Sequence, residues 1–146
     1  MNRMQDDRGS TLPLIIFYGA LSLVLVLLVV AATSLYLERK RLFTLADGAA
    51  LVGAEAYDLD DVIVPGGDGR PRLELQDSDV SEAVTDYLEA TPTDQFEGLV
   101  VTQADSVDGK SATVGLSAQW RPPVLTLVIP DGLRIEVTAV ARSVFE

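Results

Sequence analysis

The feature that constrains this chain most is an uncharged run of 26 residues, Leu12 to Leu37, that is almost entirely apolar. The hydrocarbon core of a bilayer needs about 20 such residues in a helix. At a rise of 1.5 Å per residue the run would form a helix roughly 39 Å long. Tyr18 and Tyr36 lie toward its two ends, where aromatic rings favour the headgroup region. We therefore predict a transmembrane helix over residues 12–37.

A cleavable secretory signal is the alternative interpretation of the same run. The small residues Val30, Ala31 and Ala32 are placed for cleavage after Ala32. However, the run is much longer than the core of a signal peptide, which has about 7–15 residues, and two acidic residues precede it. A retained membrane anchor is the favoured interpretation.

Charge divides the chain at Arg41. Residues 1–41 contain five basic and three acidic side chains, whereas residues 42–146 contain six basic and 19 acidic ones. This asymmetry indicates a short basic-flanked membrane segment followed by a small acidic domain. The acidic balance argues against a nucleic-acid partner, because phosphate binding needs clustered Lys and Arg.

The chain contains no His and no Cys. Disulfides, Cys or His catalysis and Cys/His zinc sites are therefore excluded. The remaining catalytic option is a buried carboxylate pair, but the acidic residues fall mainly in loops and on polar helix faces, where solvated charge is the ordinary interpretation. We predict a protein that is not an enzyme, with no cofactor and no evident small-molecule substrate.

Calcium is the better chemical candidate, because hard cations bind oxygen ligands. Two clusters were weighed, the first formed by Asp58, Asp60 and Asp61 and the second by Asp77 and Asp79. Neither has the twelve-residue EF-hand pattern, and solvated acidic loops are far commoner. We therefore predict no metal site.

Helical periodicity continues beyond Arg41. Apolar residues follow a 3-4-3-4 spacing from Leu42 to Ala56, and the positions around them are small. Two glycines within three turns disfavour a helix unless they allow close packing. The helix is expected to extend through residues 38–57. Its apolar stripe is either a core face of the domain, a coiled-coil stub, or a subunit-contact face formed by Leu42, Leu45, Ala46, Ala49, Ala50, Val52 and Gly53.

The N-terminal residues resemble those of a known family. The string Arg8-Gly9-Ser10, the apolar span and the segment from Glu38 to Ala56 are similar to the start of Tad (tight adherence, Flp-type) pilus-assembly proteins of the TadE/TadG-like group. The resemblance implies a cytoplasmic N-terminus, a domain outside the bacterial cell membrane and other pilin-like subunits as partners. It decides the orientation, because the charges flanking the span slightly favour the reverse. The matching residues are Arg8, Gly9, Ser10, Arg39, Arg41, Leu42, Ala46, Asp47, Ala49, Ala50, Leu51 and Ala54.

One departure from the prepilin pattern concerns processing. Prepilin-like proteins are cut after a Gly, and the fifth residue of the mature chain is Glu. Cleavage between Gly9 and Ser10 would place Leu14 at that position. The chain therefore resembles a TadG-type or minor component more than a polymerising pilin, and Gly9–Ser10 is a candidate processing site.

Residues 58–146 are predicted to form a small α+β domain. An amphipathic helix is expected over residues 79–90, followed by a strand over 99–106 and an Asp-Gly hairpin turn over 107–110. Strict alternation then predicts two more strands, over 112–120 and 133–141. The result is a three-stranded antiparallel sheet with helices on its apolar face, the general plan of pilin-like proteins.

Trp120, the single tryptophan, ends the second of these strands. It is expected in the core, and the alternative is a place at the membrane surface beside residues 124–129.

These observations together predict four segments, namely a cytoplasmic segment (1–11), a transmembrane helix (12–37), its extension (38–57) and an acidic extracytoplasmic domain (58–146). The predicted function is a non-catalytic, pseudopilin-like component of Tad pilus assembly or a related secretion machine. The alternative is a membrane-tethered binding module that is unrelated to pili. Its sheet would present a surface to an extracellular ligand.

Overall fold

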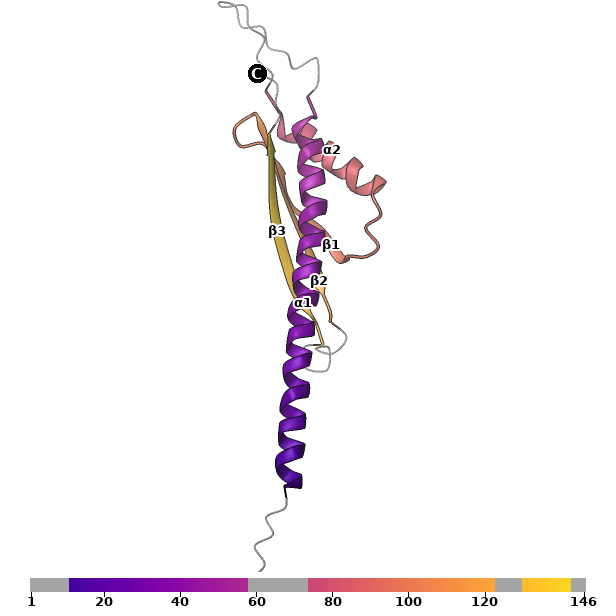
Figure 1. Cartoon of the computed structure of the whole chain (residues 1–146). Coiled ribbons are helices and arrows are strands. Elements are labelled where there is room, and N and C mark those ends of the chain that lie inside the picture. Colours follow the sequence, from indigo (N-terminus) through magenta and orange to yellow (C-terminus); the bar gives the residue numbers. More distant parts are fainter. Residues whose placement is uncertain (1–10, 58–73, 123–129, 143–146) are drawn as a thin grey trace, which may run out of the picture.

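The computed structural model describes residues 11–57, 74–122 and 130–142. Figure 1 shows a long helix whose C-terminal half packs on a sheet, beside a shorter second helix. The predicted α+β class, the long N-terminal helix and the three-stranded antiparallel sheet are confirmed. The elements are α1 (Leu12–Ala54), α2 (Asp77–Ala90), β1 (Glu97–Asp105), β2 (Ser111–Trp120) and β3 (Leu133–Arg142).

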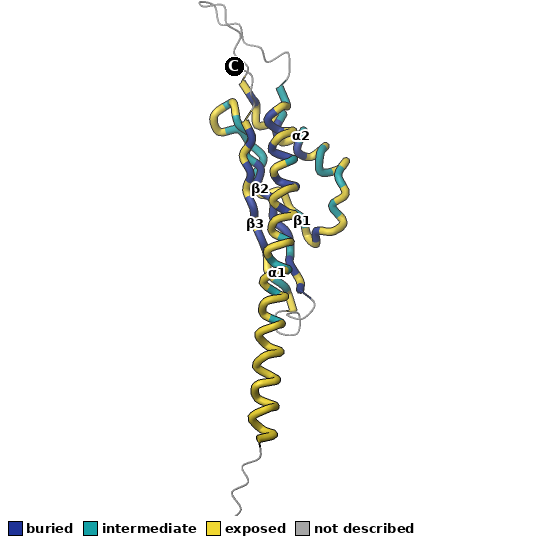
Figure 2. Tube along the Cα trace, viewed as in Figure 1, coloured by how far each residue is buried: buried dark blue, intermediate teal, exposed yellow. Residues whose placement is uncertain are grey.

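Helix α1 is a single unbroken helix of 43 residues, which makes it roughly 65 Å long. A proline occupies its first turn, where the missing N–H costs least. Its most apolar 18-residue window has a mean hydropathy of 2.9 and is 0% buried. Figure 2 shows the division, with an N-terminal half exposed on every side and a C-terminal half buried along one face. By length and composition this helix suggests a single-pass membrane anchor.

The sheet has the order β1-β2-β3 with β2 in the centre. Strands β2 and β3 pair without interruption from Ser111↔Arg142 to Trp120↔Leu133. The pairing of β1 with β2 contains two register shifts, so β1 is the less regular edge. We call the exposed N-terminal half of α1 its bare half. Because β2 and β3 are antiparallel and fully paired, Trp120 and Leu133 lie together at the end of the sheet nearest this bare half (Figure 1).

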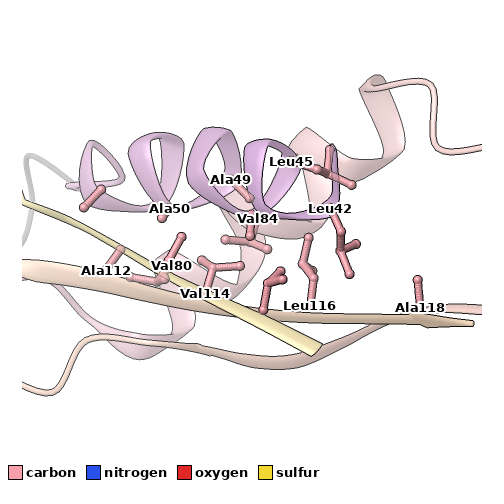
Figure 3. Close-up of a cluster of buried hydrophobic side chains, with 14 of the residues drawn as sticks. Leu42, Leu45, Ala49, Ala50, Val80, Val84, Ala112, Val114, Leu116 and Ala118 are labelled. Atoms are coloured by element: carbon pink, nitrogen blue, oxygen red, sulfur yellow. The ribbon is translucent and has the colours of Figure 1, made fainter. Parts of the chain in front are cut away.

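One face of the sheet carries the core. Alternating residues of β2 and β3 belong to one buried cluster with α1 and α2. Figure 3 shows Ala112, Val114 and Leu116 of β2 meeting side chains of the two helices. The predicted alternation is a true burial pattern in β3, whereas β2 is buried without a break from Val114 to Ala118, so its predicted solvent-exposed face is covered there. The cluster contains Leu42, Leu45, Ala46, Ala49, Ala50 and Ala54 of α1, Val80 and Val84 of α2, Ala112, Val114, Leu116, Ala118 and Trp120 of β2, and Ile135, Val137, Ala139 and Ala141 of β3.

Gly53 marks the closest approach of α1 to the rest of the core. A Cβ built on it would lie 3.1 Å from Val80 Cγ1, 3.2 Å from the Cβ of Ala112 and 3.4 Å from Val84 Cγ2. Gly48 has a similar role five residues earlier, where the hydroxyl of Tyr87 lies over it. The close packing that the two glycines predicted therefore occurs within the chain, between α1, α2 and β2.

The turn between β1 and β2 has the predicted Asp-Gly chemistry. Gly109 has φ +66°, a left-handed conformation that glycine adopts without strain. The carboxylate of Asp108 accepts hydrogen bonds from the backbone N–H groups of Lys110 (3.0 Å) and Ser111 (2.7 Å), and from the Ser111 hydroxyl (3.0 Å). These hydrogen bonds, that from Lys110 first, hold the pKa of Asp108 below its usual value.

The elements differ from the sequence prediction in their bounds. Helix α1 ends at Ala54 rather than at residue 57, and β2 and β3 are each one residue longer than predicted. Helix α2 begins at Asp77, two residues before the predicted start, and β1 begins at Glu97 rather than at residue 99. Residues 58–73, where the acidic domain was predicted to begin, lie outside the described residues.

Replacing Gly53 by Leu should destabilise the fold. The added side chain would have to displace Val80, Val84 and Ala112, which costs about 1–3 kcal/mol or more of unfolding free energy. Gly19→Leu is the matched control, because no atom lies within 4 Å of a Cβ built at Gly19. Urea unfolding of the full chain in detergent micelles, followed by Trp120 fluorescence, measures the unfolding free energy of both variants. Equal midpoints for the two variants would contradict the close packing at Gly53.

Asp108→Asn should make the protein's stability depend less on pH at acidic pH. A carboxyl whose pKa is depressed by folding adds stability above its unfolded pKa, and this stability is lost as the pH falls through the folded pKa. The wild-type midpoint should therefore drop more steeply than that of the variant below about pH 4. Thermal unfolding at a series of pH values checks this, and parallel curves would be inconsistent with the hydrogen-bonded turn.

Candidate functional site: the two faces of the long helix

The predicted subunit-contact stripe lies mostly inside the molecule. Six of its seven residues are buried in the chain's own core, where Leu42, Ala46, Ala49 and Ala50 are 0% exposed. These six residues therefore form a core face of the domain, which was the alternative interpretation of the stripe. These residues are buried because their small side chains let α1 approach β2 and α2 closely. The buried stripe therefore offers no surface to a second subunit.

The seventh residue, Val52, is 37% exposed and lies on the flank of the buried stripe. Outside the buried stripe, α1 carries Phe43 and Leu51, which are 46% and 53% exposed, with the exposed Asp47 between them at four-residue spacing. We call Phe43, Asp47 and Leu51 the outer face of α1. Sequence reasoning missed this face, although two large apolar residues outside the small-residue stripe were a usable signal.

The described part of the domain begins to pack on α1 well before Arg41. Ala31 and Leu35 are partly buried against the core, and the indole Nε1 of Trp120 donates a hydrogen bond to Ser34 Oγ at 3.3 Å. Trp120 is 6% exposed, so its predicted place in the core is confirmed. Residues 124–129, beside which the alternative placed it, lie outside the described residues.

An exposed ion pair stands next to Trp120. Arg121 Nη1 lies 2.6 Å from Glu97 Oε1, and Arg121 Nη2 donates to Gln119 Oε1 at 3.2 Å. The pair joins the end of β2 to the start of β1. Both side chains are about half-exposed, so solvent screening keeps their contribution to stability small.

The second acidic cluster, Asp77 and Asp79, has structural hydrogen-bond partners. Asp77 Oδ1 accepts the backbone N–H of Ser106 at 2.7 Å, and Asp79 Oδ1 accepts the Ser78 hydroxyl at 3.1 Å. Across residues 11–57, 74–122 and 130–142 there is no group of three or more acidic side chains able to hold a metal ion. Asp58, Asp60 and Asp61 lie outside these ranges, as do the processing residues Gly9 and Ser10.

A comparison with protein families identifies the N-terminal third of the chain. A family model described as Putative Flp pilus-assembly TadE/G-like matches residues 9–56. The matched interval encloses α1 and ends two residues after it. The resemblance drawn from the N-terminal residues is confirmed over this segment, and it supports a role in pilus assembly with other pilus components. Neither a curated protein nor a solved structure matches the chain.

Trp120→Ala should destabilise the domain by about 3–5 kcal/mol, because it empties a large buried site. Ser34→Ala should cost about 1 kcal/mol, since it leaves the indole N–H without its acceptor. Tyr36→Ala is the control, because Tyr36 is 67% exposed nearby. Chemical unfolding followed by circular dichroism measures all three. Equal stabilities for the Trp120 and Tyr36 variants would be incompatible with the observed packing.

Proposed function

We propose that this chain, whose N-terminal third carries a TadE/G-like segment, is a membrane-anchored, non-catalytic and pseudopilin-like component of Tad pilus assembly. Its N-terminus lies in the cytoplasm, and its acidic domain faces away from the cytoplasm. One observation carries the proposal. The family match over residues 9–56 coincides with α1, which serves both as an apolar anchor and as the core helix of the domain.

The bare half of α1 supports the anchoring step. Large apolar side chains such as Ile15, Leu23 and Val29 are more than half-exposed, and they lie on all sides of the helix. An aqueous surface of this size and composition is unfavourable, whereas in lipid it costs nothing. The lipid bilayer is therefore the first partner that we propose.

The shared helix supports the pilin-like mechanism. Because α1 continues from the bare half into the core without a break, no flexible linker separates anchor and domain. A displacement of the anchor is transmitted to the domain as a rigid body. This property suits an assembly subunit that must present its outer domain at a defined position.

The outer face of α1 is the subunit-contact surface that we propose in place of the buried stripe. Phe43 and Leu51 offer exposed apolar area on a helix whose other side is already occupied. Asp47 between them adds a charge that can set the register with a partner helix. The expected occupant is another pilin-like or pilus-assembly subunit in the same membrane.

Leu51→Glu and Phe43→Glu should each weaken this contact without unfolding the domain. Both side chains are exposed, so the domain's stability should change by about 0.5 kcal/mol or less. A desolvated carboxylate in the interface should weaken co-purification with the other Tad components roughly tenfold or more and reduce piliation. Val107→Glu, at a position that is 87% exposed in the β1–β2 turn, is the matched control.

Normal piliation in both outer-face variants would overturn the contact. A second experiment tests the alternative of a binding module unrelated to pili. A strain that lacks this chain is compared with a strain that carries it. Unchanged piliation in the absence of the chain would favour the binding module, whereas lost piliation that the wild-type chain restores supports the assembly role.

A further inference from the structure

The domain packs against a part of α1 that lies within the predicted membrane span. The predicted span reaches Leu37, yet Ala31 and Leu35 are packed on the core and Ser34 accepts the hydrogen bond from Trp120. The end of the sheet nearest the bare half therefore lies beside residues 31–35 of α1 (Figure 1). A span over residues 12–37 would draw this end of the sheet into the hydrocarbon.

That placement is physically unfavourable. Open sheet edges exposed to lipid do not occur in the hydrocarbon region, because their backbone groups would lose every hydrogen-bond partner. The end of the sheet also carries the ionised side chains of Glu97 and Arg121, which are about half-exposed. Charges in the membrane interior are costly. The hydrocarbon must therefore end at about Ala31.

The remaining length of helix fits a bilayer. Leu12 to Ala31 is 20 residues, which gives roughly 30 Å of helix. The hydrocarbon core of a typical bilayer is about 30 Å thick. The helix from Leu12 to Ala31 is therefore long enough to cross the hydrocarbon core without tilting.

We propose that the membrane-proximal end of the domain rests on the phospholipid headgroups of one leaflet, with the hydrocarbon spanning Leu12 to Ala31. Among the described residues, the membrane-proximal end includes Trp120, Arg121, Leu133 and Arg134, together with Glu97, which pairs with Arg121. This inference rests on the proposed anchoring, since a chain outside the membrane would not contact the headgroups in this way. The partner surface is the headgroup layer of a bilayer.

The residues at this level have the chemistry of a membrane interface. Tyr36 is exposed on α1 just above Ser34, and Leu133 is 44% exposed at the start of β3. Both fit the interface, where a side chain meets apolar and polar surroundings together. The exposed bases of residues 39–41 follow one to two turns later, roughly 7–11 Å along the axis from Ser34. Their long side chains can reach phosphate oxygens from there.

The experiment uses the absence of cysteine in the chain, because each introduced thiol is then a unique label. Single variants Leu133→Cys, Val107→Cys and Leu23→Cys are reconstituted as full chains into nanodiscs of phosphatidylethanolamine and phosphatidylglycerol. Nanodiscs expose both bilayer faces, so the readout is independent of orientation. The measured quantity is the rate of labelling by a charged, membrane-impermeant thiol reagent.

Leu133→Cys should react roughly tenfold more slowly than Val107→Cys, because the thiolate is the reactive form and the headgroup region disfavours it. Leu23→Cys, in the middle of the span, should not react. Each variant is also labelled in detergent after urea unfolding, where all three rates should be equal. Circular dichroism in the nanodisc confirms that the domain is folded.

The two failures are distinguishable. Leu133→Cys could react as fast as Val107→Cys while Leu23→Cys stays protected. This result would mean that α1 spans the bilayer but the domain does not contact the headgroups, and it would overturn the inference. Labelling of Leu23→Cys would overturn the anchoring itself. Tyr36→Cys fixes the boundary. Its labelling should be slowed to a similar degree as that of Leu133→Cys, whereas a thiol there that is as unreactive as that of Leu23→Cys would extend the hydrocarbon to Leu37 and refute the proposal.

Discussion

The close packing of α1 on β2 and α2 is the interaction on which the rest of the structure depends. It is possible because the inner side of α1 carries alanines and glycines, with Gly53 within 3.1–3.4 Å of its neighbours when a Cβ is built on it. A helix with larger side chains would stand further from the sheet and leave the inner residues of β3 half-covered. The same packing joins the exposed apolar half of α1 to the domain without a linker, because one continuous helix supplies both that half and the core stripe.

Much of this fold was predictable because its signals are local. The uncharged run predicted the helix, the alternation in β2 and β3 predicted their buried faces, and Asp108-Gly109 predicted the turn between the first two strands. The role of the small-residue stripe was not predictable, because a helix face packs in the same way on its own domain or on another subunit. The hydrogen bond between Ser34 and Trp120 was equally inaccessible, since 86 residues separate its partners and neither one has a distinctive pattern.

The family match covers the part of the chain in which α1 combines two properties. The matched interval, residues 9–56, contains the exposed apolar half of α1, its core stripe and its outer face. The sheet and α2 lie beyond the matched interval. The small residues of the stripe let the sheet pack closely, whereas the apolar half has the length and composition that a bilayer requires, so both properties belong to the matched segment.

The distribution of charge favours an upright domain. Among the residues that the structure describes, five of the seven basic side chains lie near the proposed bilayer surface, namely residues 39–41, Arg121 and Arg134. They outnumber their acidic neighbours Glu38, Glu97 and Asp131. Helix α2 carries five acidic residues and no basic one, and it packs beside Gly48 and Gly53 of α1, roughly 20–30 Å along the axis from Ser34. This distance exceeds the Debye length at physiological salt, about 8 Å. An upright domain therefore keeps its acidic helix out of the field of an anionic membrane, whereas a domain lying flat would bring those carboxylates against it.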